Sequence, residues 1–96
     1  MIAVSKAELK IIKDILLASV PDCKVKAFGS RTKNTFKQNS DLDLAVVGSG
    51  KLGFSKMGEL KLSFEESNLP FRVDVLDYNS ISQNFKNIID KSFEFL

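Results

Sequence analysis

The sequence contains no histidine, no tryptophan and a single cysteine, Cys23. A zinc site built from histidine and cysteine and a Ser-His-Asp catalytic triad are therefore both excluded. Cys23 has no second cysteine with which to form an internal disulfide, and one free thiol is typical of a reducing compartment. Any metal ion that binds this chain is expected to be a hard cation held by carboxylates.

Long apolar runs and a large excess of charge are also missing. No stretch approaches the roughly 20 apolar residues that a membrane span requires, and residues 1–6 lack the layout of a signal peptide. The sequence thus predicts a cytoplasmic protein that does not bind membranes. With 14 Lys and Arg against 12 Asp and Glu, the net charge is only +2. This net charge is too small for sequence-independent binding to nucleic acid. No base-specific pocket can be identified in the sequence, so sequence-specific binding is not expected either.

The residues that are present suit one small folded domain. The chain has 96 residues, of which 44% are hydrophobic and 27% are charged. This balance provides enough apolar material to fold and too little length for a second domain. We therefore expect a single domain over residues 1–96.

Helical and extended patterns alternate along the chain. Ser5 and Glu8 have the spacing of a capping box at the start of a first helix that runs to about Ala18. The polar residues 31–40 suit only a short helix or turn. Apolar spacing predicts further helices over 54–68 and 82–95 and strands over 24–28, 41–47 and 71–76. This order predicts an α/β or α+β fold, with a small mixed sheet of about three strands covered by helices.

Three acids fall within the predicted strands. Asp41 and Asp43 are two residues apart, so both side chains leave the same face, while Leu42 and Leu44 point into the core. Asp74 lies between two valines of another strand. Like charges side by side on a sheet repel one another, and a cation such as Mg²⁺ would relieve that repulsion. The alternative is that the acids lie at strand ends and are simply solvated.

Gly29 and Ser30 directly follow the first predicted strand. A glycine lets backbone N–H groups approach a phosphate and a serine adds a hydroxyl donor, although Gly-Ser after a strand is usually only a turn. The short connection to Asp41 allows the two strand ends to form one site. Arg31 is placed either to reach a phosphate or to lie exposed on the surface. It belongs to a run of five cations and no acid over residues 24–40, which either attracts a polyphosphate or forms a solvated basic face.

The last predicted helix is rich in apolar side chains. A stripe over residues 85–93 is expected to pack on the sheet. Other apolar residues lie near the chain end or beside polar loops, where they either complete a small core or form a docking surface for a partner. The stripe consists of Phe85, Ile88, Ile89 and Phe93, and the remaining residues are Phe36, Phe54, Phe95 and Leu96.

The motifs together resemble the signature of the nucleotidyltransferase superfamily of DNA polymerase β. The matching segments are Phe28-Gly29-Ser30-Arg31, then Asp41-Leu42-Asp43-Leu44 after a ten-residue gap, and later Arg72-Val73-Asp74-Val75. The resemblance covers nearly the whole chain. The small size is similar to that of the minimal nucleotidyltransferases, which are often paired with a helical HEPN-domain protein in toxin–antitoxin pairs.

The resemblance implies a nucleotidyltransferase fold and a set of roles. Gly29 and Ser30, with Arg31 beside them, would bind a nucleoside triphosphate. Asp41 and Asp43 would bind two Mg²⁺ ions, and Asp74 would complete the catalytic and metal site as a ligand or as the base for the acceptor hydroxyl.

The implied reaction moves a nucleoside monophosphate, most simply AMP from ATP, onto a hydroxyl of a HEPN-type partner protein. Two alternatives stay open: an antitoxin subunit that binds nucleotide and neutralises its partner by contact, and transfer to a small molecule such as an aminoglycoside. The sequence does not distinguish which nucleotide and acceptor are used, the stoichiometry of the complex, or whether the isolated chain is active.

Overall fold

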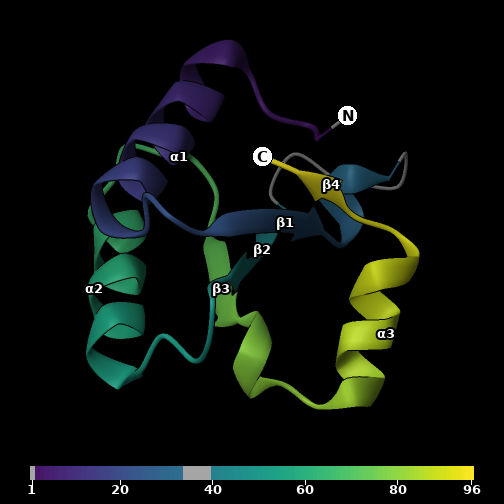
Figure 1. Ribbon diagram of the computed structural model, residues 1–96. Coiled ribbons are helices and arrows are strands. Elements are labelled where there is room, and N and C mark those ends of the chain that lie inside the picture. The colour runs from purple at the N-terminus through teal and green to yellow at the C-terminus, as the bar shows by residue number, and fades with distance from the viewer. Residues whose placement is uncertain (1, 34–39) are drawn as a thin grey trace.

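The computed structural model describes residues 2–33 and 40–96, in which three helices flank a four-stranded sheet (Figure 1). Helices α1 and α2 lie on one side of the sheet and α3 lies on the other. No helix in these two ranges is both long enough and apolar enough to cross a membrane. The elements are α1 (Lys6–Ser19), β1 (Lys24–Phe28), β2 (Leu42–Val47), α2 (Phe54–Glu65), β3 (Val73–Asp77), α3 (Gln83–Lys91) and β4 (Glu94–Phe95), with 3-10 turns η1 (Ser30–Thr32) and η2 (Tyr78–Ser80).

Helix α1 starts at the predicted capping box. The Ser5 hydroxyl accepts from the Glu8 N–H at 3.1 Å, and the Glu8 carboxylate accepts from the Ser5 N–H at 2.8 Å. Both helices on this side bury one stripe against the sheet, because apolar residues recur at helical spacing. The core so formed contains Ile12 and Leu16 of α1, Leu60 and Phe64 of α2, and the inward-facing residues of β1, β2 and β3.

The strand order is β3-β2-β1-β4, with β1 antiparallel to β2 and β2 parallel to β3, so the predicted mixed sheet is confirmed. Leu42 and Leu44 are fully buried, as their phase predicts. The register places Phe28 of β1 opposite Asp43 of β2, and Asp43 opposite Asp74 of β3. Residues in register share a face of the sheet, so this face carries both acids away from α1 and α2.

The C-terminal segment differs from its prediction. The helix expected over 82–95 ends at Lys91, and the chain then returns as β4 to pair antiparallel with β1. The sheet therefore has four strands where about three were predicted. The physical reason is that β1 would otherwise be an edge with unpaired N–H and C=O groups.

The prediction that an apolar stripe of α3 packs on the sheet is also wrong in part. Ile89 is buried, but Ile88 is 65% exposed and Phe85 is 37% exposed, because this short helix covers only one end of the sheet face. Leu96 packs against the core, whereas Phe95 and especially Phe54 are exposed. Phe36 lies outside the described residues, as does most of the short helix or turn expected over 31–40, of which η1 forms the start.

Candidate active site

The three predicted acids come together at one end of the open sheet face. Asp43 and Asp74 are cross-strand neighbours, and Asp41 lies two residues before Asp43. Burial of the carboxyl, followed by the charges of Asp74 and Asp41, raises the pKa of Asp43 from 3.8 to about 6, against a lowering effect of Arg72. The like-charge cluster expected from the sequence therefore exists, and the solvated alternative does not describe Asp43.

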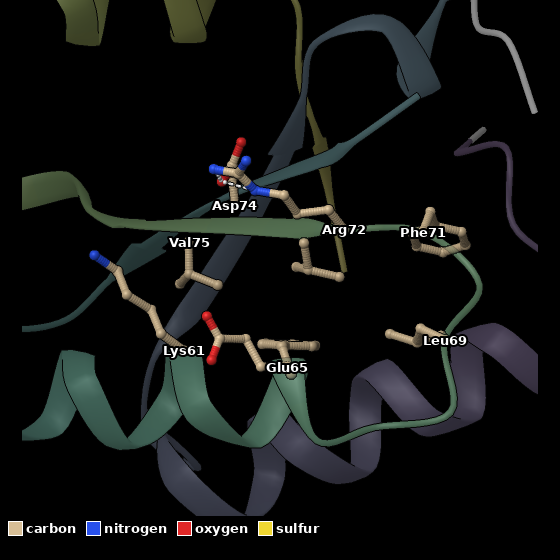
Figure 2. Close-up of a pocket in the computed structure, with 9 residues that line it drawn as sticks. Lys61, Glu65, Leu69, Phe71, Arg72, Asp74 and Val75 are labelled. Carbon is tan, nitrogen blue, oxygen red and sulfur yellow. Dashed lines mark hydrogen bonds and ion pairs between the residues drawn. The ribbon is translucent and has the colours of Figure 1, made fainter. Parts of the chain in front are cut away.

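Asp74 has a cationic partner that the sequence analysis did not assign. Arg72 donates from Nε and Nη2 to Oδ1 of Asp74, at 3.1 and 2.8 Å, and its own side chain is largely exposed (Figure 2). The two residues are separated by one position on an extended segment, so their side chains leave the same face. That spacing is the signal that could have predicted the pair.

Carboxylates are suitable ligands for a divalent cation, but the side chains of these acids are not arranged around a common point. Over residues 2–33 and 40–96, no three Asp, Glu, Cys or His side chains converge closely enough to hold a metal ion. Asp74 is paired with Arg72. Oxygen donors are nevertheless what Mg²⁺ prefers, and a cation would remove the repulsion that raises the pKa of Asp43. Both hydrogen bonds from Arg72 go to Oδ1 of Asp74.

Gly29 makes room for Asp43. It precedes η1 with φ 82° and ψ −162°, a conformation that is essentially restricted to glycine. A Cβ atom built on Gly29 would overlap Oδ2 of Asp43. The sequence predicts that a glycine at position 29 lets a phosphate approach, and the space needed by Asp43 is a second reason for a glycine here. The Gly29 carbonyl accepts from the N–H and the hydroxyl of Thr32, which holds the turn that displays Ser30.

Arg31 is buried, with a set of internal partners. Its Nε donates to the carbonyl of Ser40 at 2.7 Å, its Nη1 donates to the carbonyl of Ala3 at 2.6 Å, and its guanidinium carbon lies 3.9 Å from the centroid of the Phe71 ring. The alternative that Arg31 lies exposed on the surface is therefore wrong. Its role in nucleotide binding stays a prediction. What the contacts show is that Arg31 fixes Ser40, the residue directly before Asp41.

A polar cluster that local sequence patterns did not reveal anchors α3 to β1. Lys26 forms an ion pair with Asp90 at 2.7 Å, and the Tyr78 hydroxyl donates to the same carboxylate at 2.6 Å. The ammonium group lies 4.4 Å from the centroid of the Tyr78 ring and 4.5 Å from that of Phe93. The hydrogen bonds from Lys26 and Tyr78 lower the pKa of Asp90. Lys26 is thus not part of a solvated basic face.

Asp77 joins the end of β3 to the loop before α2. Its carboxylate is buried and accepts from the N–H groups of Leu52 and Asn79 and from the hydroxyl of Ser80. Asp77 is the last residue of β3, one position beyond the end of the strand predicted over 71–76. These bonds give it a structural role distinct from that of Asp74.

A mixed sheet with a Gly-Ser turn, an Asp-x-Asp pair and a third acid at one end of its open face defines a nucleotidyltransferase. The family model described as "Polymerase beta, Nucleotidyltransferase" matches residues 10–96, and this chain belongs to that family. A curated relative, the "Probable protein adenylyltransferase MntA" of Haemophilus influenzae, is 47% identical over 90 residues, which cover 94% of this chain and 79% of the relative. The predicted class of enzyme is confirmed.

Solved structures show the same fold. A toxin–antitoxin structure with AMP-PNP is 30% identical to this chain with a TM-score of 0.75, over 92% of this chain and 70% of that one. A mutant of the MntA-HpeT toxin–antitoxin is 27% identical with a TM-score of 0.73, also over 92% and 70%. The predicted nucleotidyltransferase fold is thereby confirmed.

Proposed function

We propose that this chain transfers AMP from ATP to a hydroxyl group of a partner protein, as the antitoxin of a toxin–antitoxin pair. The observation that carries the proposal is the placement of Asp43, opposite Asp74 and packed against Gly29 at the start of the turn that displays Ser30. The 47% identical relative named as a probable protein adenylyltransferase supports the acceptor class. The structural relative crystallised with AMP-PNP supports an adenine nucleotide.

The roles proposed for the residues follow from their chemistry. Asp41, Asp43 and Asp74 would hold two Mg²⁺ ions, which would neutralise the charge that develops during displacement at the α-phosphate. Ser30 donates its hydroxyl to the triphosphate, next to the small Gly29. Asp74 would complete the site as a metal ligand or as the base that accepts the proton of the acceptor hydroxyl.

The surroundings of the reaction are part of the same proposal. The single domain covers residues 1–96, acts in the cytoplasm and works beside a helical HEPN-type toxin. Arg31 would serve the nucleotide indirectly, because its bond to the Ser40 carbonyl positions the segment that carries Asp41 and leads into β2.

Transfer is tested with ATP labelled at the α-phosphate, Mg²⁺, and the protein encoded by the gene adjacent to this one. We expect label on the partner protein and, by mass spectrometry, an added AMP on a hydroxyl side chain. ATP labelled at the γ-phosphate is the matched control, because that label leaves with pyrophosphate and should not appear on protein. A complex that neutralises the toxin without any added AMP would contradict transfer and support neutralisation by contact.

Ser30→Ala is expected to weaken ATP binding by about 1–3 kcal/mol, because one charge-assisted hydrogen bond to phosphate is lost. Isothermal titration calorimetry measures this change directly. The chain offers a matched control in Ser49, which follows Gly48 at the opposite end of β2 from Asp43. Ser49→Ala should leave ATP affinity unchanged, and equal losses in both variants would contradict the placement of the triphosphate at Ser30.

A further inference from the structure

The starts of β2 and β3 meet at the end of the sheet that carries the acids. The N–H of Leu42 donates to the carbonyl of Arg72 at 2.9 Å, beside the first residue pair of this parallel ladder. Leu42 directly follows Asp41, and Arg72 lies two residues before Asp74. Bonds at the end of a ladder open more easily than those in its middle. The spacing between Asp41 and Asp74 therefore depends on what holds the chain just outside this bond.

The Arg31 side chain contacts both chain segments at that point. Its Nε donates to the carbonyl of Ser40 at 2.7 Å, and Ser40 leads into β2. Its guanidinium carbon lies 3.9 Å from the centroid of the Phe71 ring, and Phe71 leads into β3. A guanidinium is flat, so it can stack on a ring with its face and donate hydrogen bonds from its edge. Arg31 thus joins the segments that enter the two strands.

The same residue ties these strand ends to the turn that displays Ser30. Arg31 directly follows Ser30 within η1. Its Nη1 donates to the carbonyl of Ala3 at 2.6 Å, and its own carbonyl accepts from the N–H of Ala3 at 2.7 Å. The residue is 4% exposed. Because both its backbone and its guanidinium are held, Arg31 fixes the turn relative to the strand ends.

We propose that Arg31 is a positioning residue for transfer, which sets the distance between the turn at Ser30 and the strand ends that carry Asp41 and Asp74. This role rests on the proposed function and works through the geometry of the site instead of through contact with phosphate. The triphosphate and the acids must be aligned, and a misplacement on the order of 1 Å costs about a hundredfold in rate. The effect of Arg31 therefore falls on the transfer step and not on the docking of the partner protein.

Arg31→Lys tests this role, because lysine keeps the positive charge and loses the flat fork of donors. With α-labelled ATP and the adjacent-gene protein, we expect kcat to fall about a hundredfold while KM for the partner protein stays the same. Phe71→Leu removes only the ring under the guanidinium, and kcat should fall about tenfold. Its matched control is Phe93→Leu, which removes a ring 4.5 Å from the Lys26 ammonium and should leave kcat unchanged.

Hydrogen exchange on the free chain gives a readout that does not depend on transfer. In Arg31→Lys the amide of Leu42 should exchange about tenfold faster, because the bond to the Arg72 carbonyl opens more often. The amide of Val46, near the other end of β2, should keep its rate. A residue that only stabilised the fold would accelerate the exchange of both amides equally. Phe71→Leu is used for both measurements if Arg31→Lys does not fold.

The outcomes separate this role of Arg31 from the proposed function. Unchanged kcat in Arg31→Lys and Phe71→Leu, or equal acceleration of the two amides, would overturn the positioning role and leave the proposed function standing. Absence of transfer by the unmodified chain would overturn the proposed function. The exchange of Leu42 against Val46 would then still decide whether Arg31 fixes the strand ends.

Discussion

Asp43→Asn is expected to reduce nucleotidyl transfer by about a thousandfold or more, because a metal-held carboxylate contributes several kcal/mol to the transition state. The variant keeps the shape of the side chain and the register of β2, so the fold should be retained. Asp41→Asn and Asp74→Asn should also remove transfer, since the site depends on all three acids. Transfer is measured with α-labelled ATP and the partner protein.

The same substitution should make the metal-free protein more resistant to heat at neutral pH. The pKa of Asp43 is raised from 3.8 to about 6 in the folded state, so folding favours the protonated carboxyl. Above pH 6 the carboxylate is charged in both states, and its burial near Asp74 and Asp41 opposes folding. Below about pH 4 it is neutral in both states, and the penalty disappears. Asparagine removes the penalty, so its advantage should be full above pH 6 and fade as the pH falls toward 4.

Thermal melts without Mg²⁺ at pH 7.5 and pH 4 measure this difference. Asp22→Asn, at an exposed carboxyl on the turn before β1, is the matched control and should show no comparable pH-dependent gain. If Asp43→Asn instead unfolds the protein, Asp43 is a structural residue and its catalytic assignment is wrong.

Gly29→Ala should have the second largest effect, because its new methyl group and Oδ2 of Asp43 cannot occupy the same space. The Asp43 carboxylate is the flexible partner, so it will turn out of the site. A misplacement on the order of 1 Å at a reacting group costs about a hundredfold in rate. The glycine-only backbone conformation adds about 1–3 kcal/mol of destabilisation.

The chain contains a matched glycine for this test. Gly58 lies within α2 with no atom near the position of an added Cβ, so Gly58→Ala should stabilise the protein by about 0.5–1 kcal/mol and leave transfer intact. Urea titrations give both free energies of unfolding, and labelled ATP gives both rates. Normal transfer by Gly29→Ala would show that Asp43 does not need the space that Gly29 leaves.

Much of the fold could be predicted because its determinants are local. The Ser5–Glu8 capping box marks the start of α1, and the phase of Leu42 and Leu44 fixes the direction in which Asp43 points. The Gly-Ser turn and the acids are likewise local motifs, so their appearance at one end of the sheet face required only a short connection between β1 and β2.

Features that depend on distant residues were not predictable in this way. Lys26 and Asp90 are 64 positions apart, and no spacing rule links them. Strand β4 exists because β1 needs a partner, a requirement that becomes visible only when the sheet is assembled. Arg31 lies next to a Gly-Ser turn, which favours a surface role, yet its contacts with Ala3 and Phe71 bury it.

The two-residue strand β4 also determines how far this sheet can grow. It occupies the side of β1 that faces away from β2 and offers almost no length for a further strand, so the described sheet has one long open edge, at β3. A sheet with one such edge can pair edge to edge with a second copy, and the pair then has no long edge left. Edge-to-edge pairing through the described strands would therefore close at two chains.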